Sequence, residues 1–362
     1  MTTRTSRNGA KQASAKSSSL LLGLALTVSI CQSALLCQTG ALSGFGWALL
    51  ASLSGCFYAT ISQWNELIQT LTPEQSTWKR AIIAGFFLAV ALFLFGHSMT
   101  QKPWNPFDLL SICFIPWSRT VWRKLFVGDT LHEPIERTST FVILLAASLF
   151  LFPDLIKIAH VLRPNETNGF YMVQWKDLQA AQLPRSLAFL AALLFGAASS
   201  LQRPQDRSIS SRTFWTIPTA ISAILLSTSG WIALQVVGSR VSVMGDFENF
   251  PVHKAVALIP AMLSGVVLLA LRPQLHIRNS LRIGRLSTHW WQALGSFAGI
   301  TISLVLLERS LITGLDLAAL ASLMLGQYVA LRQQPTTVQF APPLASVPML
   351  EAEKSLLSSQ NS

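Results

Sequence analysis

Apolar runs of about 20 residues recur along most of the chain, and they limit what it can fold into. A helix needs about 20 mostly apolar residues to cross the hydrocarbon core of a bilayer. A water-soluble monomer would have to expose much of this apolar surface, which such proteins rarely do. The sequence therefore predicts an all-α transmembrane fold. The candidate ranges are 20–38, 42–62, 81–98, 106–126, 138–156, 184–202, 213–237, 253–271, 289–307 and 311–331.

Composition agrees with a membrane protein and excludes two other classes. Of the 362 residues 51% are hydrophobic and 12% are charged, with a mean hydropathy of +0.46. Such a chain is too apolar to be disordered over most of its length. The four cysteines lie in or beside apolar runs, which excludes a disulfide framework. Residues 1–19 are polar and basic and predict a disordered tail, and the proline-containing residues 333–362 predict a second, cytoplasmic one.

Basic residues predict the topology, because they accumulate on the cytoplasmic side of helical membrane proteins. The range 106–126 contains Arg119, Arg123 and Lys124, so it fits either a crossing or a re-entrant segment. If all ten ranges cross and the N-terminus is inside, most of the 27 Lys and Arg residues lie inside. If the range 106–126 does not cross, the Lys and Arg residues divide almost equally between the two sides. We therefore expect ten crossings in the plasma (inner) membrane, with both termini cytoplasmic.

The spacing of the ten ranges predicts an internal duplication. In each set of five, the longest step lies between the starts of the second and third ranges. The first half would be 20–156, the second 184–332, and 157–183 an extracytoplasmic linker. Two units with an odd number of crossings insert in opposite orientations, as in many alternating-access transporters. The expected fold is a ten-helix polytopic bundle built as two inverted five-helix repeats.

A local pattern also occurs in both halves. "RKLFVGDTLHEP" leads into "TFVILLAASLFLFP", and "LVLLERSLITG" leads into "LDLAALASLMLGQYVAL". Each has an apolar helix, a carboxylate at its end (Asp129, Glu308), a polar turn and a helix rich in small residues. With "LPRSLAFLAALLFGAASSLQRP" after the linker, the chain resembles the EamA-like ten-helix members of the drug/metabolite transporter superfamily. The resemblance covers about residues 20–332, rests on architecture and composition, and implies transport of a small molecule.

Polar residues inside predicted crossings are the first candidates for function, since each needs a partner or a water-filled cavity. Hydrogen bonds between helices are the alternative use of such residues. Near the outer turn, Glu308 and Asp316 are candidates for ion coupling. Gly295 and Gly299 form a G-x-x-x-G pattern, which predicts close helix packing. The candidates for the substrate pathway are Gln32, Tyr58, Gln235, Gln327 and Tyr328.

Motifs for catalysis, metals and cofactors are not evident. The six histidines show no i, i+4 pair, and the sequence contains no HExxH, GxSxG or Walker-type loop. We therefore expect no enzyme activity, no metal and no cofactor. Basic inner loops, formed by Arg272, Arg278, Arg282 and Arg285, would contact anionic lipid headgroups. Expected partners are membrane lipids and a small-molecule substrate, with a second copy of the chain as a further candidate and no nucleic acid.

The functional expectation is a multi-pass secondary transporter, a permease or exporter, of a small polar metabolite or drug-like molecule. Two alternatives remain open. One is a non-transporting scaffold or subunit of a cell-envelope complex. The other is a membrane enzyme on lipid-linked substrates, with Arg119, Arg123, His132 and Glu133 at the inner face. A central cavity between the halves would favour the transporter, and a cleft at the inner face would favour the enzyme.

Overall fold

The computed structural model describes the chain over most of its predicted crossings. The described residues are 2–69, 75–102, 104–127, 137–161, 182–201, 211–237, 258–307 and 313–332. They form helices joined by short turns, and no strand occurs among them. The helices are α1 (Thr2–Gln38), α2 (Gly44–Ser62), α3 (Trp64–Gln69), α4 (Gln75–Thr100), the 3-10 helix η1 (Pro106–Phe114), α5 (Ile115–Val127), α6 (Arg137–Val161), α8 (Pro184–Ser200), α9 (Ser211–Val237), α11 (Ile259–Gly265), the π-helix η5 (Val266–Leu271), α12 (Arg272–Ile283), α13 (Arg285–Leu307) and α14 (Gly314–Arg332).

Seven helical stretches in the described part of the chain are long and apolar enough to cross a membrane. They lie in α1, α2, α4, α6, α9, the continuous stretch from α11 to α12, and α14. Helix α8 is apolar but shorter, with 17 residues. The described residues thus confirm a helical fold without strands, and these long apolar helices fit an integral membrane protein. Ten crossings arranged as two inverted repeats stay a prediction.

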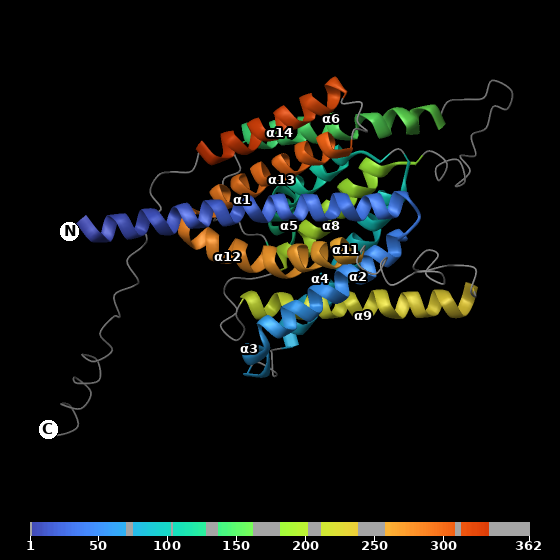
Figure 1. Cartoon of the computed structure of the whole chain (residues 1–362), viewed down its shortest axis with the longest axis horizontal. Helices are drawn as coiled ribbons and strands as arrows, with labels where there is room; N and C mark the ends of the chain where they lie inside the picture. Colours follow the sequence, from blue (N-terminus) through green and yellow to red (C-terminus); the bar gives the residue numbers. More distant parts are fainter. Residues whose placement is uncertain are drawn as a thin grey trace.

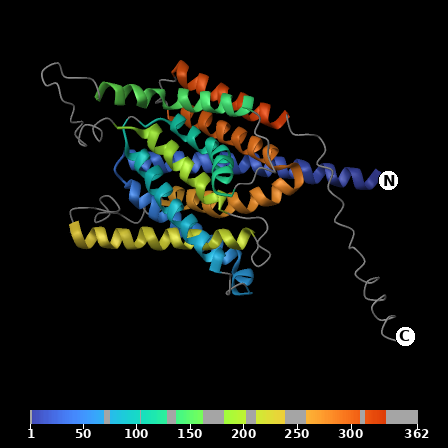
Figure 2. The same cartoon turned by 180° about the vertical axis from the view of Figure 1, so that it is seen from behind.

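Helices far apart in the sequence pack against each other. Helix α1 packs on α13, α6 on α14, and α4 on both α8 and α9. Figures 1 and 2 show these helices running roughly side by side through one bundle. The beginning of α1 and the end of α14 lie at the same end of the bundle, which we name the terminal end (Figure 1). The opposite end is named the distal end.

Glycines bring the backbones of several helices into contact. A Cβ on Gly295 of α13 would lie 1.9 Å from the carbonyl oxygen of Leu20 in α1, and one on Gly299 would lie 2.8 Å from Thr27 Cβ. Such distances leave no room for a side chain, so α1 and α13 cross at a spacing that only glycine permits. The packing role predicted for this G-x-x-x-G pattern is confirmed.

The stretch from α11 to α12 contains a break in its helical register. Residues Val266–Leu271 form a π-helical turn, in which the N–H of Arg272 donates to the carbonyl of Val267. A π turn accommodates one more residue than an α turn, and such turns often lie at functional sites. Arg272 is the first residue after it, and Pro273 follows within the first turn of α12.

Candidate functional site

A cavity lies between helices towards the terminal end of the bundle. Its larger hollow has a volume of about 580 Å³, counting the space that opens to solvent, and an adjoining hollow has about 340 Å³. We name the two hollows together the polar cavity. The polar side chains that line it are Cys113, Arg119, Ser199, Arg272, His276, His289, Gln292, Ser296 and Gln327, together with the Trp215 indole.

Helix ends from different parts of the chain supply these side chains. Ser199 lies in the last turn of α8, Trp215 in the second turn of α9, and His276 near the start of α12. Gly284 separates α12 from α13 with a φ of 84°, a conformation that glycine adopts most readily. This turn folds α13 back on α12, and the imidazole rings of His276 and His289 stack with centroids 4.3 Å apart.

The cavity offers hydrogen-bond donors on side chains that are removed from solvent. Trp215 is 5% exposed and Gln292 is 7% exposed. Within the described part of the chain, neither the indole Nε1 of Trp215 nor the amide Nε2 of Gln292 has a hydrogen-bond partner. Buried polar groups without a partner are rare in native proteins, because each costs about 1–3 kcal/mol. The cavity lining therefore presents two buried donors that have no acceptor among the described residues.

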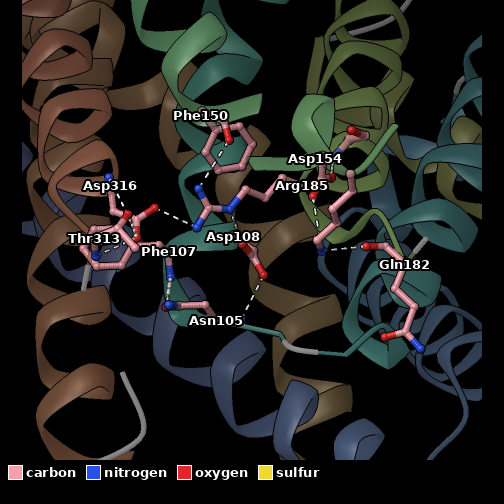
Figure 3. A network of polar contacts seen from close by, with 11 residues as sticks. Asn105, Phe107, Asp108, Phe150, Asp154, Gln182, Arg185, Thr313 and Asp316 are labelled. Atoms are coloured by element: carbon pink, nitrogen blue, oxygen red, sulfur yellow. Dashed lines mark hydrogen bonds and ion pairs between the residues drawn. The ribbon is translucent and has the colours of Figure 1, made fainter. Parts of the chain in front are cut away.

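A buried ion network lies at the distal end and centres on Arg185, at the start of α8 (Figure 3). Its guanidinium Nε lies 3.2 Å from Asp108 Oδ1, and its Nη2 lies 2.7 Å from Asp316 Oδ1. Nη1 donates to the backbone carbonyl of Phe150 at 3.4 Å, and the guanidinium also lies over the Phe150 ring. Both carboxyl groups are 2% exposed, so a single guanidinium pairs with two buried acidic side chains, one from η1 and one from α14.

Backbone groups hold the two carboxylates of the network in place. Asp108 Oδ2 accepts the N–H of Asn105 at 2.9 Å, as part of a capping box that starts η1. Asp316 Oδ2 accepts the backbone N–H and the hydroxyl of Thr313 at 3.2 and 2.8 Å. Each aspartate therefore accepts hydrogen bonds at the start of its own helix while it pairs with Arg185. The first turns of η1, α8 and α14 thus meet at one ion cluster.

Asp154 of α6 adds a second connection to α8 at the same end. Its Oδ2 accepts the backbone N–H of Ser186 at 2.7 Å, and its Oδ1 lies 3.8 Å from the ammonium of Lys157. Lys157 also donates to the carbonyl of Gln182, just before α8 begins. Asp154 interrupts the apolar range 138–156, yet α6 continues through it and through Pro153, because the carboxylate is satisfied.

The residues predicted for the substrate pathway do not meet in one place. Gln32, Tyr58, Gln235 and Tyr328 all have exposed side chains on their helices. Gln327 lines the smaller hollow of the polar cavity, where its Nε2 donates to the Cys113 carbonyl at 3.2 Å.

The remaining candidates divide between the two sites. Asp316, predicted for coupling, is a member of the ion network, and Glu308 lies outside the described residues. Of the four residues proposed for the enzyme alternative, Arg119 lines the polar cavity, whereas His132 and Glu133 lie outside the described residues. Arg123 is partly buried on α5 and does not line the cavity. No group of three His, Cys, Asp or Glu side chains in the described ranges could hold a metal ion.

Sequence reasoning missed the central residues of both sites. Arg185 was not among the candidates, although its position inside the apolar range 184–202 was a signal for it. Asp108 gave a similar signal, three residues into the range 106–126. Arg272 was assigned to a lipid-facing loop, although the structure places it in the lining of the cavity.

Comparisons with known proteins give no family. No family model matches the chain, and no curated protein matches it. A solved structure described as "Crystal structure of protein" is 15% identical, with 88% of this chain and 99% of that chain covered and a TM-score of 0.47. A likeness at this level carries no argument about the fold or the function.

Proposed function

We propose that the protein is a multi-pass membrane transporter that moves a small polar molecule by alternating access. The observation that carries this proposal is the polar cavity between the helices, together with the ion network beyond it. Ser199, which lines the cavity, and Arg185, which centres the network, lie about 20 Å apart along α8. A site reached from one end and closed at the other is what one state of such a transporter requires.

The pattern of helix contacts supports two related halves. We match the first five predicted crossings with the last five in chain order. Then α1 corresponds to α8, α2 to α9, α4 to the α11–α12 stretch, α5 to α13 and α6 to α14. The packing of α1 on α13 then has its counterpart in α8 on α5, and both pairs occur. The packing of α4 on α9 corresponds to that of α11 on α2, and α4 on α8 corresponds to α11 and α12 on α1. These pairings favour a two-fold relation between the halves.

Two glycines occupy matching places in this scheme. Gly85 lies in "AIIAGFF" of α4, and Gly265 lies in "AMLSGVV", which runs from α11 into η5. A Cβ on Gly85 would lie 2.6 Å from Ile221 in α9, and one on Gly265 would lie 2.1 Å from the Ala51 carbonyl in α2. Each glycine thus packs on the second helix of the other half. The match supports the inverted repeat from sequence and contact together.

Topology is the first test. A side-sensitive reporter is fused after Asn165 in one version of the chain and after Ser362 in another. We expect the first to report the outside and the second the cytoplasm, because five crossings precede the linker and ten precede the C-terminus. If both report the same side, the inverted-repeat transporter is wrong and the scaffold or the membrane enzyme becomes the leading alternative.

Access to the cavity is the second test. In a version with its four cysteines replaced by serine, Ser199→Cys is labelled with a membrane-impermeant maleimide. We expect labelling from the cytoplasmic side alone, and from both sides once Arg185→Gln opens the network. Ser14→Cys, exposed before the first predicted crossing, is the control whose labelling should not respond to Arg185→Gln. Labelling of Ser199→Cys that ignores Arg185→Gln would count against alternating access.

A further inference from the structure

The charges that line the polar cavity are of one sign. Arg119 and Arg272 line the larger hollow, and no Asp or Glu is found among the described residues around either hollow. In the described part of the chain, no hydrogen bond or ion pair is found for the guanidinium of Arg272. A guanidinium removed from bulk water is costly unless an anion or another acceptor satisfies it. The ion network at the distal end meets this requirement for Arg185. Arg272 is partly buried, and no described Asp or Glu lines the hollows beside it.

The neutral groups beside Arg272 are also donors. The Trp215 indole can only donate, and the Gln292 amide presents an unpartnered Nε2. Both side chains are more than nine-tenths buried and line the larger hollow with Arg272. A cluster of donors around a cation matches a ligand that only accepts, which is the chemistry of a carboxylate or another oxyanion.

Apolar side chains form another part of the lining. Phe195 and Leu268 line the larger hollow, with Ile115 and Ile277 close to them. A fully hydrated inorganic anion makes no favourable contact with such apolar side chains. An organic anion can place its carboxylate on the donors and its apolar body against these side chains, which is the usual division of a small-molecule site.

We propose that the polar cavity binds a small organic anion, whose carboxylate lies on Arg272, Trp215 and Gln292 and whose apolar part contacts Phe195 and Leu268. The inference deepens the proposed function, since it names the substrate class of the same cavity. It also corrects the role expected for Arg272, which lies in the cavity lining, whereas Arg278 further along α12 is exposed.

The test is equilibrium binding of benzoate to the purified full chain in phosphatidylcholine nanodiscs, measured by calorimetry. Benzamide is the matched neutral probe, because it has the same shape without the charge. We expect benzoate to bind and benzamide to bind at least about tenfold more weakly, as charged hydrogen bonds exceed neutral ones. Equal binding of the two probes would overturn the proposal, and so would the absence of benzoate binding.

Variants locate the site. Arg272→Gln should weaken benzoate binding by about tenfold or more, and Trp215→Phe, which removes only the indole donor, by several-fold. Arg282→Gln on the same helix does not touch the cavity and should leave binding unchanged. If Arg272→Gln does not fold, Trp215→Phe alone decides. A wild-type affinity in Trp215→Phe would then refute the site.

Two further outcomes separate the possible failures. If phosphatidylglycerol in the nanodisc abolishes benzoate binding, the cavity takes a lipid headgroup and the proposal is wrong. Benzoate binding is measured without transport, so it can be separated from the topology and access tests. If benzoate binds but both of those tests fail, the anion site stands and the proposed transporter is wrong. If both of those tests succeed but benzoate does not bind, the transporter stands and the proposed anion site is wrong.

Discussion

Removing the Arg185 side chain should destabilise the protein more than any other single loss of charge in the described chain. Arg185→Gln leaves Asp108 and Asp316, each 2% exposed, without their shared cation. Breaking a buried ion pair by removing one partner costs about 3–5 kcal/mol, because an uncompensated charge stays behind. Two carboxylates lose their partner here, so we expect the upper part of this range. By contrast, Lys157→Gln removes an ammonium that is 34% exposed and 3.8 Å from Asp154, which costs at most about 1 kcal/mol.

The assay compares thermal unfolding of the full chain and its variants in one detergent. Arg185→Gln should melt far below the wild type, whereas Lys157→Gln should melt close to it. Combining Arg185→Gln with Asp108→Asn and Asp316→Asn removes the excess charge and should recover a large part of the loss. The reasoning would be refuted if Arg185→Gln and Lys157→Gln had equal effects, or if the triple variant were the least stable.

Two more predictions concern helix packing. The Trp47 indole, fully buried in α2, donates to Ser264 Oγ at 3.1 Å, so Ser264→Ala should cost about 1–3 kcal/mol, and an unchanged melting midpoint would contradict this. Gly295→Val places a side chain where even a Cβ would lie 1.9 Å from the Leu20 carbonyl oxygen. We expect α1 and α13 to separate and the protein to lose at least about 3 kcal/mol of stability. Size-exclusion chromatography would then show loss of the monodisperse peak. Gly314→Ala is the control, because nothing lies within 4 Å of the added carbon; equal behaviour of the two variants would refute the packing argument.

The helical spans could be predicted from the sequence because the bilayer imposes both a length and a polarity on each of them. Each of the ten predicted ranges is helical over most of the residues that the structure describes. The details follow other forces. Helix α6 continues past the predicted end at 156, since Asp154 and Lys157 find partners near α8. The range 106–126 begins as a 3-10 helix, because Asn105 and Asp108 cap its start.

The candidate site could not be predicted to the same extent, because it depends on which side of each helix faces the interior. Gln32 lies in the middle of an apolar run, and only the packing of α1 shows that its side chain faces outward. Arg185 and Asp108 are 77 residues apart, so no local pattern joins them. Arg272 was expected in a basic loop, whereas it follows the π turn and lines the cavity.

The π turn at Val266–Leu271 also affects how this part of the chain tolerates insertions and deletions. Because it holds one residue more than an α-helix needs, the residues before and after it follow two separate helical phases. Deleting one residue from the turn would remove only this extra residue and restore a regular α-helix, with the residues on both sides close to their present orientations. Gly265 would keep its contact with Ala51, and Arg272 and His276 would still line the cavity. A one-residue deletion within α12 itself would instead rotate the residues after it by about 100°.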